Sequence, residues 1–227
     1  MSEHRAVVWD LDGVMVDSAE AHNRSWVVMA KHFGVPYDPE RDFPRIFGRH
    51  NNDIISSMWH VTDPAKIKEM ADFKERVFRE EAAHLKPLPG VVELVKALRE
   101  SGWKQAIGSS APLLNVQALL EGTGLSQYMD AIASGDDVTV GKPNPEVFLI
   151  AFRRLGVEPR NGVVIEDAPA GVQAGKRAGA AVLAVTTTHD AETLREAGAD
   201  RVADSLEEIT VADLEALVQA NQARARA

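Results

Sequence analysis

The sequence contains no cysteine, no excess of basic residues and no long apolar run. Without cysteine, disulfide bridges and thiolate metal sites are excluded. The 25 lysine and arginine residues are outnumbered by 34 aspartate and glutamate residues, which gives a net charge of −9. This balance argues against nucleic acid as a partner, because no basic stripe is available to follow a phosphate backbone. A small phosphate ester needs only a local positive pocket, so the acidic net charge does not argue against such a ligand.

The first residues and the apolar segments give no sign of export or of a membrane. Residues 1–5 lack the layout of a signal peptide. No uncharged stretch approaches the roughly 20 apolar residues that a membrane span needs. We therefore expect a cytoplasmic protein without membrane contact, and we take a monomer as its default state.

Length and composition suit one large α/β domain with an insertion. The chain has 227 residues, of which 45% are hydrophobic and 26% charged, enough for a sizeable core. Short strand-like apolar segments alternate with amphipathic helical patterns, and this order predicts a doubly wound parallel sheet of the Rossmann-like type. The strand-like segments are residues 7–9, 105–108, 131–133, 163–165, 182–185 and 201–203.

One region interrupts the alternation. Helical patterns cover residues 19–33, 51–59 and 64–84, and no convincing strand lies between them. We expect an all-helical cap domain at residues 18–87, inserted into a core domain of residues 1–17 and 88–227. The chain returns through Lys86-Pro-Leu-Pro-Gly90, whose prolines and glycine suit a hinge. An insertion at the end of the first strand is expected to cover the site as a lid.

Polar residues follow several predicted strands at the points where these strands end. Asp10 and Asp12 follow the first strand, and Gly13 allows the chain to reverse there. Further along the chain, Ser109, Ser110, Glu166 and Asp167 directly follow later strands, and Lys142 lies on the loop that follows the segment 131–133. The carboxyl ends of parallel strands share one edge, so these side chains are expected to meet.

A cluster of carboxylates repels itself, and a hard divalent cation such as Mg2+ relieves the repulsion. Phosphoryl transfer requires charge neutralisation and in-line positioning, which Mg2+, Lys142 and the Ser109 hydroxyl can supply. A carboxylate can attack phosphorus to give an aspartyl-phosphate, while a second acid exchanges protons with the leaving group and with water. Spacing alone leaves open which of Asp10 and Asp12 takes which role.

Four dispersed motifs resemble those of the haloacid dehalogenase (HAD) superfamily, in its β-phosphoglucomutase and phosphatase-like subgroup with a small helical cap. The motifs are Asp10-x-Asp12-Gly13, Ser109, Lys142-Pro143 and Glu166-Asp167-Ala-x-Ala-Gly171. The resemblance implies that Asp10 is the nucleophile and Asp12 the general acid and base. It implies Mg2+ held by the Asp10 side chain, the Asp12 carbonyl and Asp167, with help from Glu166. An acid at position 12 is typical of members that act on phosphate esters.

Each of these residues also has a purely structural interpretation. Asp10 and Asp12 can form a solvated turn, and Lys142 can be a surface charge. Ser109 or Ser110 can cap the helix predicted from residue 112. Glu166 can orient a backbone amide while Asp167 alone meets the metal.

Two residues of the predicted cap are candidates for substrate binding. His22 follows a serine by four residues, as in sugar-phosphate members of the superfamily. The alternative interpretation of His22 is a plain surface histidine. Arg49 lies in the polar stretch of residues 47–53, where it can recognise an anionic or hydroxyl-bearing part of a substrate. The alternative for Arg49 is a structural ion pair with a nearby carboxylate.

Three functions compete. The favoured one is a Mg2+-dependent phosphatase for a small phosphorylated metabolite, a sugar or polyol phosphate. The second is a mutase that resembles β-phosphoglucomutase, in which water is excluded. That enzyme's cap carries Lys-Gly-x-x-Arg, where this chain has Phe47 and Asn51, and its polar sugar contacts are replaced here by Ala111-Pro-Leu113. The third is a non-catalytic phosphate-binding regulatory protein, which no motif favours.

Overall fold

The structure is a computed structural model that describes residues 4–46 and 49–226. The chain divides into two compact units. Met1–Asp17 and Lys86–Ala227 form the first, which we call the core unit. Ser18–Leu85 form the second, which we call the helical unit.

The core unit is built on a parallel sheet of six strands in the order β3-β2-β1-β4-β5-β6. All six were expected from the sequence, with ends that agree within one residue, and the predicted doubly wound fold is confirmed. The strands are β1 Ala6–Trp9, β2 Lys104–Gly108, β3 Ala131–Ala133, β4 Gly162–Glu166, β5 Ala181–Val185 and β6 Arg201–Ala203.

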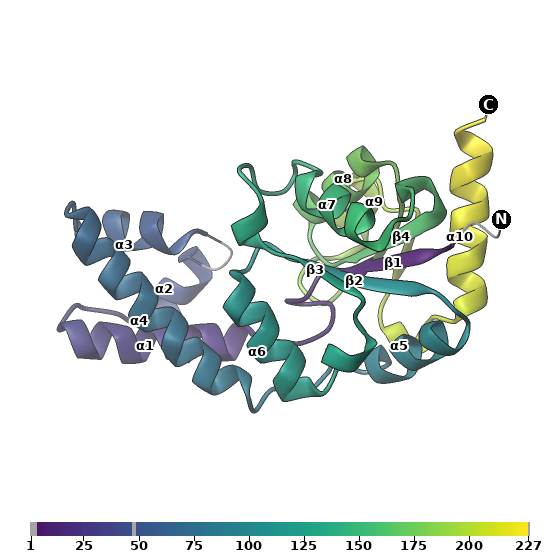
Figure 1. Ribbon diagram of the computed structural model, residues 1–227. Helices are drawn as coiled ribbons and strands as arrows, with labels where there is room; N and C mark the ends of the chain where they lie inside the picture. The colour runs from purple at the N-terminus through teal and green to yellow at the C-terminus, as the bar shows by residue number, and fades with distance from the viewer. Residues whose placement is uncertain (1–3, 47–48, 227) are drawn as a thin grey trace. The chain divides into compact units, whose positions relative to one another are not determined.

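Helices cover both faces of this sheet (Figure 1). On one face, α7 packs on β1, β2 and β3, and α8 packs on β4 and β5. On the other face, α5 contacts β2, and α10 contacts β4 and β5. The helices of the core unit are α5 Val91–Glu100, α6 Leu113–Thr123, α7 Glu146–Leu155, α8 Pro169–Ala178, α9 Ala191–Glu196 and α10 Val211–Arg224.

Strand β1 is apolar throughout and β4 is apolar up to Glu166, because both faces of the sheet are covered there. Val8 packs in a buried cluster with Phe148 and Phe152 of α7. Its neighbour Trp9 points to the opposite face, where its Nε1 donates to Gln105 Oε1 at 3.2 Å. Gln105 in turn donates to a backbone carbonyl of α5, so this buried polar pair is fully bonded. A sheet buried on both sides leaves its carboxyl edge as the natural place for a site.

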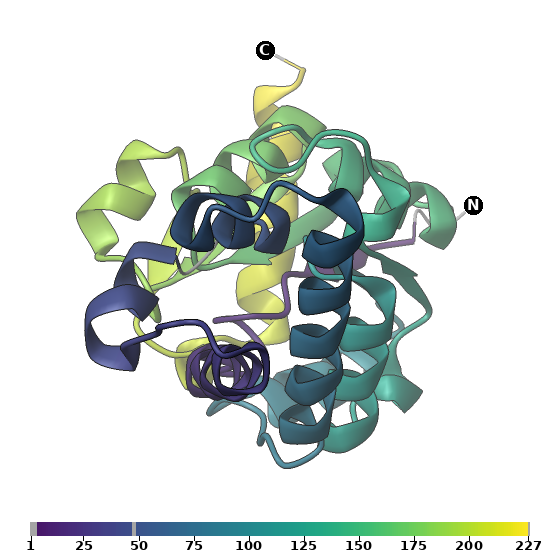
Figure 2. The ribbon, with the colours of Figure 1, turned by 90° about the vertical axis from the view of Figure 1, so that its left-hand side faces the viewer.

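The helical unit has its own apolar core. In the described part of this unit the helices are α1 Ala19–Phe33, α2 Pro39–Ile46, α3 Asn51–Trp59 and α4 Pro64–Ala82. Figure 2 views α1 end-on, with α4 alongside it. The core is formed by Trp26, Met29, Ile46, Ile54, Ile55 and Met70.

Helix α2 is absent from the sequence-based prediction. It holds two prolines in eight residues, and proline within a pattern usually signals an end or a loop. Pro39 occupies the first turn, where its missing N–H costs nothing. Asp42 accepts from the Asp38 amide at 2.9 Å and secures the same turn.

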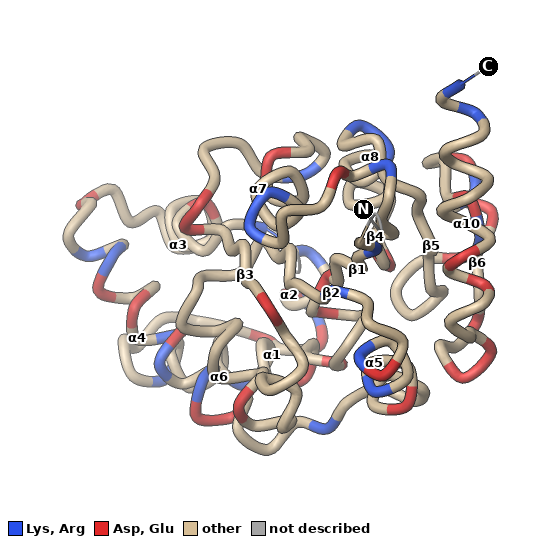
Figure 3. The backbone as a smooth tube through the Cα atoms, turned by 45° about the vertical axis from the view of Figure 1, so that its right-hand side comes forward, with Lys and Arg blue, Asp and Glu red and all other residues tan. Residues whose placement is uncertain are grey.

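Charge is mixed over the surface. Figure 3 shows lysine and arginine positions interspersed with acidic ones along the helices. Among the described residues, no helix combines the length and the apolar character needed to cross a membrane.

The segment that returns from the helical unit is tied to the core unit. Val16 forms a β-bridge with Pro87, and the amide of Leu88 donates to Met15 O at 2.9 Å. Residues 86 and 87, which the sequence places with the cap, therefore belong to the core unit in the structure. At the end of the segment, Gly90 has φ +80°, in the left-handed region.

We predict that Gly90→Ala lowers the free energy of unfolding by roughly 1–3 kcal/mol more than Gly102→Ala does. Both glycines have a left-handed φ, +80° and +76° respectively, so alanine is strained at each. A Cβ at Gly90 would lie 2.3 Å from the Glu207 amide nitrogen, whereas nothing lies within 4 Å at Gly102. Urea titration of both variants measures the difference, and equal losses would contradict the close backbone packing at Gly90.

Candidate active site

The register of the sheet places the candidate residues at neighbouring strand ends. Trp9 is aligned with Ile107 on one side and with Ile165 on the other. The next residue, Asp10, donates its amide to Ile165 O at 2.9 Å. Ser109 and Glu166 lie at the corresponding ends of the neighbouring strands. One edge of the sheet therefore gathers these side chains, as predicted.

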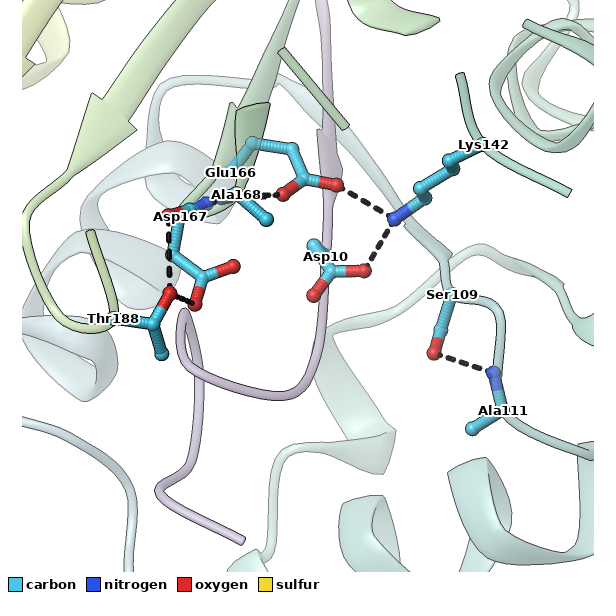
Figure 4. A network of polar contacts seen from close by, with 8 residues as sticks. All are labelled: Asp10, Ser109, Ala111, Lys142, Glu166, Asp167, Ala168 and Thr188. Atoms are coloured by element: carbon cyan, nitrogen blue, oxygen red, sulfur yellow. Dashed lines mark hydrogen bonds and ion pairs between the residues drawn. The ribbon is translucent and has the colours of Figure 1, made fainter. Parts of the chain in front are cut away.

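Lys142 is the bridge within this group (Figure 4). Its Nζ donates to Asp10 Oδ1 at 2.5 Å and to Glu166 Oε1 at 2.6 Å. The side chain is only 10% exposed, and Nζ lies 4.7 Å from the centre of the Phe148 ring. The Lys142–Pro143 peptide bond is cis. Lys142 is therefore a largely covered ion-pair partner, and the surface-charge interpretation is wrong.

Burial and mutual repulsion shape the charge states of the cluster. Burial raises the pKa of Asp10 well above its ordinary value, and the Lys142 charge opposes this rise. Burial, followed by the Glu166 charge, raises the pKa of Asp167 to about 7. Burial acts against the lysine charge, but Asp10 and Glu166 outweigh it and raise the pKa of Lys142. The carboxylates outnumber the single cation, so without a further cation Asp10 and Asp167 hold their protons more tightly than isolated carboxylic acids do.

Asp12 lies on the turn that follows β1. Gly13 takes a left-handed φ of +79° there, and its amide donates to Val16 O at 2.7 Å. Asp12 is half-buried, and its charge raises the pKa values of both Asp10 and Asp167. Asp10 itself is buried, so a solvated turn does not describe this pair.

The donors around Asp10 suit a hard divalent cation. Oxygens of Asp10, Glu166 and Asp167 lie within 4.8 Å of one another, a spacing at which one ion can bridge them. All three residues are buried and all three offer carboxylate oxygen, the ligand type that Mg2+ prefers. Glu166 has further partners, since its Oε2 accepts from the amides of Asp167 at 3.0 Å and Ala168 at 3.2 Å.

Ser109 is buried at the same edge, and Ser110 is exposed. The Ser109 hydroxyl accepts from the Ala111 amide at 3.1 Å and so closes a local turn (Figure 4). Helix α6 begins later, with Pro112 at its N-cap and without a side-chain cap. The helix-cap interpretation of Ser109 and Ser110 is therefore wrong.

His22 lies in the helical unit and is not a plain surface residue. Its ring stacks on Phe78 with centroids 4.0 Å apart, and Nδ1 lies 2.8 Å from Lys74 Nζ. Burial, then the Lys74 charge, lowers the pKa of His22 well below its ordinary value. An ammonium only donates, so Nδ1 of a neutral His22 accepts from Lys74. Lys74 is itself buried and also donates to Glu75 at 3.0 Å.

Arg49 is exposed, and its guanidinium donates to Ser57 Oγ at 3.3 Å, which is a hydroxyl group and not the carboxylate of the alternative interpretation. Phe47 and Gly48, which the comparison with the mutase motif uses, lie outside the described residues. Asn51 begins α3, and its side-chain amide donates to Glu75.

Two residues at the sheet edge were not expected from the sequence. Thr188 donates to Asp167 Oδ2 at 2.6 Å, and His189 Nδ1 lies 3.2 Å from Asp167 O. Both lie on the loop after β5, more than 20 residues beyond Asp167, and no local pattern singles them out. The only available signal is that this loop also begins at a carboxyl strand end.

The fold and the site together define an α/β enzyme with carboxylate chemistry at the carboxyl edge of a parallel sheet. Residues 4–179 match the family model of the haloacid dehalogenase-like hydrolases, and the chain belongs to this family. The predicted superfamily is thereby confirmed.

The chain is also similar to named enzymes. The chain is 33% identical over 200 residues to the phosphorylated carbohydrates phosphatase of Thermotoga maritima, covering 86% of this chain and 91% of the relative. It is 33% identical over 210 residues to hexitol phosphatase A of Escherichia coli, covering 91% and 94%. The β-phosphoglucomutase of Clostridium difficile has a similar structure, with TM-score 0.83 and 25% identity over 97% of this chain and 99% of that one. The predicted enzyme class, a phosphoric monoester hydrolase, is confirmed.

We predict that Lys142→Met destabilises the metal-free protein by about 3–5 kcal/mol at about pH 8, because two buried carboxylates lose their cation. The loss of stability is smaller at about pH 5. Asp10 binds its proton more tightly in the folded protein than in the unfolded chain, and removal of Lys142 strengthens this preference. Such a group stabilises the folded state at low pH, and the stabilisation is lost as the pH rises through the raised pKa. Urea titrations at both pH values measure this.

Lys176→Met is the matched control. Lys176 Nζ donates to both oxygens of Asp200 at 2.8 Å, so it too is a paired lysine. Asp200 keeps Arg224 and the Val182 amide after the change. The control is expected to lose less stability and to show less change with pH. Equal behaviour of the two variants would contradict the special position of Lys142.

Proposed function

We propose that the protein is a Mg2+-dependent phosphatase that hydrolyses a small sugar or polyol phosphate through an aspartyl-phosphate intermediate. The observation that carries this proposal is the buried cluster in which Lys142 joins Asp10 to Glu166, with Asp167 beside them. The named phosphatase relatives support phosphorylated carbohydrates and hexitols as the substrate class.

Asp10 is the nucleophile in this proposal. Lys142 fixes Oδ1 of Asp10, and the hydrogen bond from the Asp10 amide to Ile165 O fixes its backbone. The carboxylate is therefore held in one orientation. A positioned carboxylate can attack phosphorus without a large loss of freedom in the transition state. Asp12 is half-buried on the adjoining turn, which suits a group that exchanges protons with the leaving alkoxide and with water.

The Asp10 and Asp167 carboxylates and the Asp12 carbonyl would hold Mg2+, with Glu166 close by. A bound Mg2+ supplies charge neutralisation for the phosphoryl oxygens. Both oxygens of Glu166 already accept protein hydrogen bonds, from Lys142 and from the Asp167 and Ala168 amides. These bonds favour a role for Glu166 in orienting Lys142 and the Asp167 backbone over direct coordination.

Lys142, Ser109 and Ser110 bind the transferring phosphoryl group in this proposal. Lys142 is a permanently charged donor at the Asp10 carboxylate, where charge accumulates on the phosphoryl oxygens. Ser109 presents a hydroxyl at the end of β2, with its oxygen already oriented by the Ala111 amide. Because the Ser109 oxygen only accepts in this hydrogen bond, the hydroxyl hydrogen is available for a phosphate oxygen.

His22 and Arg49 are proposed to bind the part of the substrate that carries no phosphate. Neutral His22 accepts from Lys74 at Nδ1, and this contact fixes the tautomer of the ring with its proton on Nε2. Arg49 is exposed on the segment before α3 and offers further donors. Hydroxyl recognition by such donors agrees with a polyol substrate.

A mutase is the second candidate, favoured by the structural likeness to the β-phosphoglucomutase of Clostridium difficile. Against it, the segment after Ser110 is Ala111-Pro-Leu113, which offers no polar side chain to a sugar. Asn51 stands where the mutase motif has arginine, and its amide is engaged with Glu75. These departures favour water over a second sugar hydroxyl as the phosphoryl acceptor.

We predict that Asp10→Asn abolishes Mg2+-dependent release of phosphate from an aryl phosphate and from hexitol phosphates. Loss of the nucleophile is expected to lower turnover by roughly 10³-fold or more. Glu100→Gln, the same chemical change at an exposed position on α5, is the control and keeps wild-type turnover. Inorganic phosphate release measures both. A wild-type protein without Mg2+-dependent turnover on any phosphate ester would overturn the proposal and favour a non-catalytic phosphate-binding protein.

Incubation with β-glucose 1-phosphate separates the phosphatase from the mutase. We expect inorganic phosphate and free sugar, because the acceptor in the second step is water. Phosphorus NMR follows the reactant, the 6-phosphate and inorganic phosphate in one experiment. Conversion to the 6-phosphate without release of inorganic phosphate would contradict the phosphatase and establish the mutase.

A further inference from the structure

The loop after β5 reaches the Asp167 carboxylate. Strand β5 pairs with β4, so its carboxyl end lies beside the end that carries Asp167. Three residues beyond Val185, the Thr188 hydroxyl lies 2.6 Å from Asp167 Oδ2 and 3.1 Å from Asp167 O. Thr188, which follows a different strand, is thus hydrogen-bonded to the candidate metal ligand Asp167.

The donor and acceptor groups around Asp167 fix which atom carries each proton in the contact with Thr188. The Asp167 carboxylate and carbonyl only accept, and Thr188 has one proton to give. The shorter contact, to Oδ2, takes that proton. His189 Nδ1 lies 2.9 Å from Thr188 Oγ1 and 3.2 Å from Asp167 O, both of which can accept from it. The consistent arrangement has His189 Nδ1–H donating to Thr188, which donates to Asp167.

The same carboxylate oxygen is enclosed from a second side. A Cβ placed on Gly13 would lie 2.0 Å from Asp167 Oδ2 and 3.2 Å from Thr188 Cγ2. Oδ2 therefore lies against the backbone of the turn after β1 while it accepts from Thr188. Figure 4 shows the other carboxylate oxygen of Asp167 turned toward Asp10. The two contacts leave this second oxygen directed at the acidic cluster.

We propose that Thr188 is a positioning residue, oriented by His189, that holds one oxygen of Asp167 so that the other is presented to a divalent cation. The inference rests on the proposed metal-dependent function and adds a specific claim to it. Thr188 controls the affinity for the cation, and at saturating cation the chemical step proceeds at close to its normal rate. Partners of this kind typically change metal affinity by 10–100-fold.

Calorimetric titration of the metal-free protein with Mn2+, without substrate, tests the claim. Thr188→Val keeps the shape of the side chain but removes the hydroxyl, and we expect the dissociation constant to rise by roughly 10–100-fold. Thr188→Ser retains the hydroxyl and is expected to restore binding to within about 3-fold of wild type. Thr187→Val is the matched control, because the same change is made one residue earlier at an exposed position.

His189 gives a second series. His189→Phe removes the nitrogen donor and is expected to weaken Mn2+ binding less than Thr188→Val does. His189→Asn retains a donor and is expected to recover part of the loss. The midpoint of urea unfolding for every variant shows whether the fold is retained, and Thr188→Ala serves in place of the valine variant if that one unfolds.

The outcomes separate the inference from the function on which it rests. Tight Mn2+ binding by wild type and equally tight binding by Thr188→Val would overturn the positioning role and leave the phosphatase proposal intact. Absence of Mn2+ binding by wild type, together with absence of turnover, would overturn both. A fall in turnover at saturating Mg2+ with unchanged Mn2+ affinity would also contradict the inference.

Discussion

The contact of Lys142 with Asp10 and Glu166 is the interaction on which the site depends. Several carboxylates meet in a region that water scarcely reaches, and their repulsion works against folding and against ionisation of Asp10. One largely covered ammonium offsets part of this charge and at the same time fixes the direction of two carboxylates. The carboxylates that Lys142 leaves without a cation suit the site to a divalent metal ion, which in turn attracts a phosphoryl group.

The parallel sheet supplies the geometry that this interaction needs. Its central strands are apolar on both faces, so polar side chains concentrate where the strands end. The register aligns Trp9 with Ile107 and Ile165, and the following residues therefore meet at one edge. Gly13 then reverses the chain closely enough to bring its backbone against Asp167. Hydrogen-bonded register brings the strand-end residues Asp10, Ser109 and Glu166 together, and the loop before α7 adds Lys142 to them.

The features that could be predicted from the sequence are those that depend on neighbouring residues along the chain. All six strands follow from apolar runs, and Asp10 and Glu166 of the edge cluster are the residues that come where two of these runs end. Lys142 lies on a loop, and its motif with Pro143 is what indicated it. Helix α2 does not, because two prolines in eight residues resemble a loop. The contacts of His22 with Lys74 and of Thr188 with Asp167 join residues 52 and 21 positions apart, and spacing carries no signal of them.

In the proposed site, Asp10 and Asp167 share a single divalent cation. A crystal structure of the protein soaked in Mn2+ tests this most directly, because anomalous scattering locates the ion independently of the protein density. We expect one peak within about 2.0–2.3 Å of a carboxylate oxygen from both residues, a range typical of small divalent cations with oxygen ligands. A fully occupied ion bound elsewhere, with Asp10 and Asp167 left uncoordinated, would contradict it.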